Sequence, residues 1–190
     1  MRSLLAALAA LALPLVAVGP VHAQEHAAGA TVTVADMAFT PARVRVGMGE
    51  TVTWTFQDAI SHTVTSDDGF FDTGATSGGT DRGIRFASAG AFAYHCMFHA
   101  VMVGKVTVPM TATGSVKDAW KLRWLVGDNP KGRTYDVQVR RQGTKAWQRF
   151  RKVTTVGSGR FDPSSGAWQA RARTVDGAAT SGWSPVLSLP

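Results

Sequence analysis

One short stretch of the chain carries three side chains that are suited to binding a soft metal ion. The stretch runs from Tyr94 to Met102, and within it Cys96, His99 and Met102 follow one another at intervals of three residues. A thiolate, an imidazole and a thioether at this spacing can face one point if the loop curls after the end of a strand. Each residue alone is also compatible with ordinary packing, since Cys and Met commonly fill hydrophobic cores.

The thiol in this stretch is the only one in the sequence, because Cys96 is the single cysteine. An intramolecular disulfide is therefore excluded. The thiol is either buried and inert, linked to another chain, or held by a metal.

A fourth ligand has to come from elsewhere, and His62 is the candidate that lies within a strand framework. His22 belongs to the N-terminal leader and His26 to the tail that follows it. Two imidazoles, one thiolate and a weak axial thioether form the ligand set of a blue-copper electron-transfer site. Zinc is disfavoured, because its structural sites use four strong Cys or His ligands. The sequence thus predicts one copper ion bound by His62, Cys96, His99 and Met102.

Short alternating segments separated by Gly, Asp and Ser predict an all-β chain that positions these ligands. Seven or so strands in about 80 residues are typical of a sandwich or barrel. In the first half we expect strands at Thr31–Val34, Ala42–Val46, Thr51–Phe56, His62–Thr65, Gly83–Phe86, Ala91–His95 and Lys105–Val108. In the second half strict alternation predicts strands around Leu122–Trp124, Tyr135–Arg140 and Trp168–Thr174.

Composition divides the chain into two domains. Residues 24–110 contain five Lys/Arg and eight Asp/Glu, whereas residues 111–190 contain 14 Lys/Arg and five Asp/Glu. The net charge of +7 therefore originates in the second half. Residues 109–115 are rich in Thr, Gly and Ser and predict a linker, between a first domain at 31–108 and a second at 116–190.

The N-terminus predicts export. Arg2 precedes an apolar run from Leu4 to Val18, and small residues end it at Ala23. This pattern is typical of a signal peptide over residues 1–23, followed by a tail over 24–30. The run is too short for a membrane-spanning helix, so we expect no transmembrane segment. We therefore expect a periplasmic protein, or an extracellular one at the cell surface.

Several ordered landmarks make the first half resemble the cupredoxins, and within them the plastocyanin and amicyanin group. The early strand pair is represented by Phe39-Thr-Pro41 and the run Val44–Trp54, and the first histidine by Ser61–Val64. Phe71–Gly74, Gly90–Cys96 and Gly104–Val108 follow in the family's order. The resemblance implies a Greek-key β-sandwich or barrel with one type 1 copper ion. Thr63 departs from the family's usual Asn, whose role is to tie the His62 segment to the Cys96 loop.

The resemblance and the number of histidines favour an electron carrier over an enzyme. With His62 and His99 as ligands, only His26 and His95 remain after the leader, too few for a second copper centre. An apolar rim around His99 predicts transient docking of a redox partner protein; it consists of Met97, Phe98, Ala100 and Val101. Two alternatives stay open: a protein that stores or delivers copper, and a surface-binding protein in which the copper domain is secondary.

The second half resembles a fibronectin type III module, an immunoglobulin-like β-sandwich. Trp124, Tyr135–Arg140 and Trp168–Asp176 are its landmarks, and Trp168 stands where the family has a corner tyrosine. A cluster of basic residues in this half predicts either a solvated face or attraction to an anionic cell-envelope polymer or polysaccharide. Nucleic acid is not expected outside the cell. The cluster is formed by Arg140, Arg141, Lys145, Arg149, Arg151 and Lys152.

Overall fold

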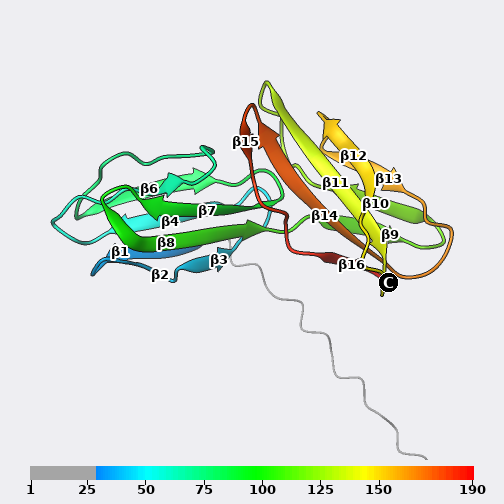
Figure 1. Cartoon of the computed structure of the whole chain (residues 1–190), viewed down its shortest axis with the longest axis horizontal. Helices are drawn as coiled ribbons and strands as arrows, with labels where there is room; N and C mark the ends of the chain where they lie inside the picture. Colours follow the sequence, from blue (N-terminus) through cyan, green and yellow to red (C-terminus); the bar gives the residue numbers. More distant parts are fainter. Residues whose placement is uncertain (1–28) are drawn as a thin grey trace, which may run out of the picture.

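The computed structural model describes residues 29–190, and its regular structure there consists of sixteen β-strands (Figure 1). The predicted all-β class is confirmed. The expected signal peptide and all but the last two residues of the expected tail lie outside the described residues. No helix within residues 29–190 has the length and apolar character needed to span a membrane.

The first eight strands form two four-stranded sheets, which we call the N-terminal sandwich. One sheet has the order β2-β1-β4-β6 and the other the order β3-β8-β7-β5. Pairing is parallel between β1 and β4 and between β3 and β8, so the chain crosses between sheets. The strands are β1 (Ala30–Ala35), β2 (Ala38–Thr40), β3 (Arg43–Arg45), β4 (Thr51–Phe56), β5 (Thr65–Ser66), β6 (Thr80–Arg85), β7 (Gly90–Cys96) and β8 (His99–Val108).

Alternation along the strands creates the core of this sandwich. In β4, Val52, Trp54 and Phe56 are fully buried, whereas the intervening threonines are not. The same period buries every second residue of β7, ending at Cys96. Side chains of both sheets therefore meet in one apolar layer, as a two-sheet packing requires.

Two strand predictions differ from the structure around the ligand residues. Strand β8 begins at His99 and not at Lys105, because the hairpin after β7 is tight enough for Cys96 to pair with His99. The segment expected as a strand from His62 is shorter, since His62 makes only an isolated bridge to Thr76 before β5 begins.

The remaining strands form a second β-sandwich, which we call the C-terminal sandwich. A three-stranded sheet has the order β13-β10-β9, and a five-stranded sheet has β12-β11-β14-β15 with β16 also paired to β14. The strands are β9 (Thr111–Ser115), β10 (Ala119–Arg123), β11 (Arg133–Arg141), β12 (Gln148–Thr154), β13 (Ser158–Phe161), β14 (Trp168–Asp176), β15 (Ala179–Thr180) and β16 (Leu187–Leu189).

The structure differs from the linker predicted at residues 109–115, because most of this segment is a strand. Thr111–Ser115 is β9 and pairs antiparallel with β10, and Met110 is 1% exposed in the core of the C-terminal sandwich. Threonine favours strands, which is consistent with β9. Because Met110 is buried in the core of the C-terminal sandwich, the chain passes from β8 to β9 without a flexible linker.

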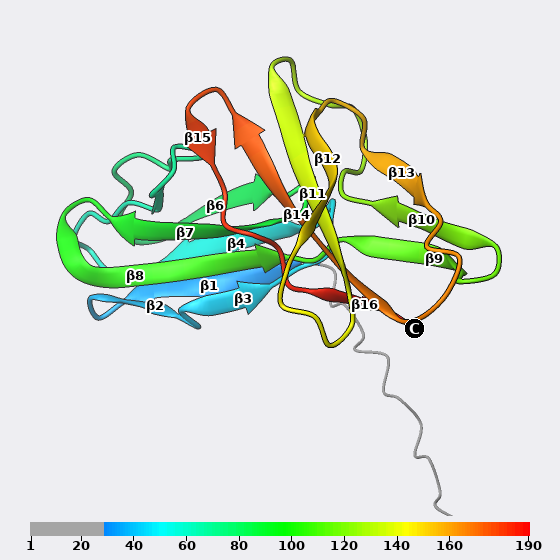
Figure 2. The ribbon, with the colours of Figure 1, turned by 45° about the vertical axis from the view of Figure 1, so that its right-hand side comes forward.

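The two sandwiches contact each other through residues 87–91, which connect β6 to β7 and include the first two residues of β7. Backbone hydrogen bonds join Ala89 to Trp124 and Val126 to Ala87, and Ala91 forms a bridge with Gly182. Buried Ala89 belongs to the C-terminal core. Because this contact involves the start of β7, the turn that follows Cys96 lies at the opposite end, away from the C-terminal sandwich (Figures 1 and 2).

Candidate metal centre

Two strands and one loop bring three predicted ligands together at the end of the N-terminal sandwich that lies away from the second domain. Alternation along β7 directs Cys96 inward, where it is 1% exposed. A register shift between His95 and Cys96 then allows Cys96 to pair with His99 at the start of β8. Such bulges commonly re-aim a side chain near a functional site.

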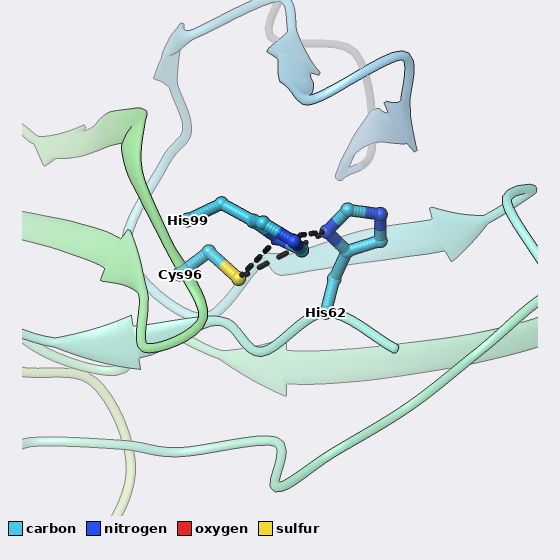
Figure 3. A group of neighbouring side chains, drawn as sticks. All are labelled: His62, Cys96 and His99. Atoms are coloured by element: carbon cyan, nitrogen blue, oxygen red, sulfur yellow. Dashed lines mark hydrogen bonds between the residues drawn. The ribbon is translucent and has the colours of Figure 1, made fainter. Parts of the chain in front are cut away.

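His62 approaches the same point from the other side. Its backbone N–H donates to Thr76 and its carbonyl accepts from Thr76, each at 2.9 Å. The imidazole is fully buried. Figure 3 shows the rings of His62 and His99 converging on the sulfur of Cys96.

The donor atoms form a compact triangle. His62 Nδ1 lies 3.1 Å from His99 Nδ1, and the sulfur of Cys96 lies 3.5 Å from His99 Nδ1 and 3.9 Å from His62 Nδ1. A triangle of this size accommodates one ion at about 2.0–2.3 Å from each atom, the range of metal bonds to imidazole nitrogen and thiolate sulfur. Both rings present the same nitrogen to the centre, as ligands of a single ion would.

Met102, the fourth predicted ligand, is 1% exposed and packs in the same core as Cys96. Alternation in β8 turns it inward, while its neighbours Val101 and Val103 point to solvent. The structure thus places a thioether inside the sandwich on the strand that carries His99. With its thiolate, two imidazoles and thioether, the donor set fits one type 1 copper ion.

Thr63 ties the His62 segment to the cysteine loop even though it replaces the family's usual Asn. Its backbone N–H lies 3.3 Å from the sulfur of Cys96, and its hydroxyl accepts from the backbone N–H of Met97 at 2.9 Å. Thr65 donates to the same hydroxyl at 2.9 Å. Hydrogen bonds around ligands fix their orientation and adjust the metal.

Asp58 is a residue of the site that sequence reasoning missed. Its Oδ2 lies 2.9 Å from Nε2 of His62, the nitrogen that faces away from Cys96. The carboxylate therefore accepts a hydrogen bond from the Nε2–H of His62, and this tautomer leaves Nδ1 free to bind a metal. A carboxylate four residues before a candidate ligand was the available signal, but the spacing alone does not show that the two side chains meet.

Another ionisable group, Tyr94, lies two residues before Cys96 in the same strand. It is 1% exposed, and its ring packs edge-on against Trp54 with centroids 5.4 Å apart. Burial raises the pKa of the Tyr94 phenol above its usual value of 10.0. The phenol is therefore protonated at neutral pH and adds no charge to the core beside the site.

Four residues predicted as a docking rim lie around the partly exposed His99. Met97, Phe98 and Val101 are 63%, 55% and 75% exposed, and Ala100 is also exposed. Val103 at 60% and Ile60 at 51% were not in the predicted set. Ile60 belongs to the loop that carries His62, so both ligand loops contribute apolar surface.

The predicted basic residues lie on the C-terminal sandwich, but only some of them share one face of its five-stranded sheet. Arg149 pairs with Gln138, which places it on the outward face of β11 that also carries Arg140. Arg151 and Lys152 line a hollow on this face. Arg141 packs beside Gly166, one position out of phase with Arg140, and Lys145 lies in the loop between β11 and β12. Sequence reasoning did not include Arg171 and Arg173, which alternation in β14 turns to the same face.

Known proteins resemble the part of the chain that holds the metal centre. A family of proteins with a Cupredoxin-like domain matches residues 5–108. Amicyanin from Paracoccus denitrificans is 35% identical over 95 residues, which cover 47% of this chain and 72% of amicyanin.

Solved structures give similar matches. Amicyanin from Paracoccus versutus is 27% identical with a TM-score of 0.40, covering 42% of this chain and 80% of that one. A purple cupredoxin from Nitrosopumilus maritimus is 27% identical with a TM-score of 0.39, covering 42% and 98%. The family match spans more than half of the sequence and includes every predicted ligand from His62 to Met102. The chain therefore belongs to the cupredoxin-like family.

Proposed function

We propose that this chain is an exported type 1 copper protein that passes single electrons between redox partners. The observation that carries the proposal is the triangle formed by His62 Nδ1, Cys96 Sγ and His99 Nδ1, in which His62 and Cys96 are buried and His99 is partly exposed. Copper bound to such a ligand set supplies a one-electron couple whose potential the surrounding residues adjust.

The residues of the chain divide the work at this site. Cys96 supplies the thiolate, which the Thr63 N–H holds in place at 3.3 Å. His62 is buried and oriented by Asp58, whereas His99 is partly exposed and offers the route between the site and solvent. Met102 would supply a weak thioether ligand, supported by its burial in the same core cluster as Cys96.

The exposed apolar rim supports transient docking at His99. It consists of the predicted residues Met97, Phe98, Ala100 and Val101. A small apolar patch lets a redox partner approach closely and leave again, as turnover requires. The rim lies at the end of the molecule away from the C-terminal sandwich, so this second domain does not cover it (Figure 2).

We propose a carrier rather than an enzyme. With His62 and His99 assigned to copper, His95 is the remaining histidine among residues 29–190, and its Nδ1 lies 2.6 Å from Asp67 Oδ1. This pairing directs His95 to a surface carboxylate. Similarity to amicyanin supports a periplasmic location.

For the C-terminal sandwich we propose a fibronectin type III-like module that attaches the carrier to an anionic polymer of the cell envelope. A three-stranded sheet packed with a larger antiparallel sheet supports this assignment. Trp168 donates from its indole N–H to the carbonyl of Ser165 at 3.0 Å, the bond expected from a residue in the corner position. The basic outward face supplies the attraction.

Copper loading of the purified chain tests the carrier proposal. We expect an intense visible thiolate-to-copper band, which Cys96→Ala and His99→Ala abolish while the far-ultraviolet dichroism of the β-fold persists. His95→Ala is the matched control and keeps the band, because His95 pairs with Asp67. A band that persists in Cys96→Ala refutes the site, and a colourless wild-type protein refutes the proposed function.

A further inference from the structure

Arginine and tryptophan side chains alternate across the outward face of the five-stranded sheet. Trp147 lies between Arg140 and Arg171, whose guanidinium carbons are 4.4 and 4.1 Å from the centroid of its ring. Trp183 lies between Arg171 and Arg173, at 4.4 and 4.8 Å. Cation–π contacts at these distances stabilise the position of each guanidinium. Three positive charges are thereby held side by side.

Hydrogen bonds to neighbouring strands fix the orientation of these guanidinium groups. Arg171 donates twice to Gln138 Oε1, at 3.0 and 2.7 Å, and Arg140 donates to Gln169 at 2.7 Å. Arg173 donates twice to Asp136 Oδ2, at 3.0 and 2.7 Å. Each bond uses part of a five-donor group, so further N–H donors stay available to a ligand.

A hollow of about 220 Å³ adjoins this row of side chains. Arg149, Arg151 and Lys152 from β12 line it on one side, and Arg173 and Trp183 line it on the other. Register shifts in the β11–β12 pairing bring Arg151 and Lys152, which are consecutive in sequence, to the same hollow. Four cationic side chains from two strands therefore surround one small space.

The one acid in the hollow is already engaged. Asp136 is 8% exposed; its Oδ2 accepts from Arg173 and its Oδ1 accepts from the backbone N–H of Val153 at 3.0 Å. Burial by itself would raise the pKa of Asp136, but these hydrogen bonds hold the pKa below its ordinary value of 3.8. Asp136 offsets one of the four cations, which leaves a local excess of positive charge.

Arg171 lies close to two other cations, Arg140 and Arg173. Burial and the neighbouring charges of Arg140 and Arg173 lower the pKa of Arg171 below its ordinary value. An anion that binds between or beside these guanidinium groups reduces the electrostatic repulsion among them. Each tryptophan ring has two guanidinium groups packed over it, an arrangement that favours binding of an anion beside the rings.

We infer that the hollow between β12 and β14 is a phosphate-binding site, with Arg149, Arg151, Lys152 and Arg173 as its donors. A phosphate monoester carries a charge of about −1.5 to −2 and three acceptor oxygens, which suits the excess of cations better than a single carboxylate does. Arginine binds phosphate through its planar fork and lysine as a point charge. The inference deepens the proposed attachment role by naming the group recognised.

Calorimetric titration of the full chain tests this assignment at constant ionic strength. The probes are inorganic phosphate, glycerol 1-phosphate and acetate. We expect both phosphates to bind. Acetate should bind at least about tenfold more weakly, because it has less charge and fewer acceptor oxygens than phosphate and so accepts fewer charge-assisted hydrogen bonds. Tighter binding of the ester identifies polymer- or lipid-borne phosphate as the source, and equal binding identifies free phosphate.

A pair of variants locates the binding. Arg151→Gln with Lys152→Gln removes two exposed donors from the hollow and is expected to weaken phosphate binding at least about tenfold. Lys121→Gln with Arg123→Gln removes the same charge from exposed positions of β10, in the other sheet, and is expected to leave affinity within about twofold. Equal losses in the two variants, or acetate binding as tightly as phosphate, overturn the inference.

Failure of this site is distinguishable from failure of the attachment role. Retention of the wild-type chain on a cation-exchange resin, released by salt, reports the general positive field of the C-terminal sandwich. Retention without any phosphate heat overturns the specific site and leaves attachment standing. Absence of both refutes the attachment role as well.

Discussion

The carboxylate of Asp58 holds the outer nitrogen of His62, with Oδ2 2.9 Å from Nε2 and the imidazole fully buried between the acid and Cys96. A carboxylate in this position increases the electron-donating strength of a ligand imidazole and places a negative charge near the metal. Both effects stabilise the more positive oxidation state.

Replacement of this acid should therefore raise the reduction potential. Asp58→Asn keeps the size of the side chain but removes its charge, and we expect a rise on the order of 60 mV, one tenfold step in a one-electron equilibrium. Voltammetry of the copper-loaded protein measures it. Asp67→Asn is the control, because Asp67 pairs with His95, which is not an assigned ligand. Equal potentials in the two variants would show that Asp58 has no special influence.

The assignment of Met102 as a weak thioether ligand is tested by Met102→Gln. A harder amide oxygen favours Cu(II), so the potential should fall while the thiolate band remains. The exposed Met37, 41% accessible, provides the control Met37→Gln, which should leave the potential unchanged. A Met102→Gln protein with the wild-type potential would exclude Met102 as a ligand.

Electron self-exchange between two copies of the chain reports on the apolar rim without a known partner. Val101→Asp places a charge on a side chain that is 75% exposed, and two such copies repel each other at the rim. We expect the self-exchange rate, measured by NMR line broadening at fixed ionic strength, to fall at least about tenfold with little change in spectrum. Val156→Asp adds the same charge to the C-terminal sandwich, where Val156 is 55% exposed, and should have a much smaller effect. Equal slowing in both variants would move the contact away from His99.

Gly104 provides the space that the ring of Tyr94 occupies across the β7–β8 pair. A Cβ atom at position 104 would overlap with ring and hydroxyl atoms of Tyr94. Gly104→Ala should therefore lower the free energy of unfolding by about 1–3 kcal/mol, the usual cost of overpacking. Denaturant titration measures the loss. The control Gly83→Ala meets only the side chains of Thr51 and Thr53 and should cost far less.

Thr174 joins the two sandwiches through a fully buried hydroxyl. Its Oγ1 donates to the carbonyl of Ala89 at 3.0 Å and lies 2.9 Å from the hydroxyl of Ser88. Thr174→Val leaves both groups without this partner, so we expect a loss of about 1–3 kcal/mol. Calorimetry should show one unfolding transition in the wild type and a broadened or divided one in the variant. Thr113→Val, on an exposed face of β9, should behave like the wild type.

Sequence alone was sufficient for the features that depend on local order. The three-residue spacing of Cys96, His99 and Met102 predicts a ligand loop, and the alternation of Val52, Trp54 and Phe56 predicts a half-buried strand that the structure contains with the same bounds. Both signals survive because a strand turns alternate side chains to opposite faces whatever its neighbours are.

Tertiary structure decided what depends on contacts between distant segments. The segment expected as a linker is β9 because it pairs with β10. The register of β11 with β14 places Arg171 and Arg173 on the same face as Arg140, where they contact Trp183. Tertiary structure also closed the metal triangle, since Cys96 and His62 are 34 positions apart and no spacing rule states that Nδ1 faces the sulfur and Nε2 faces Asp58. The physical reason is that pairing register and side-chain direction across a sandwich depend on the packing of the whole core, whereas residue type and period are properties of one segment.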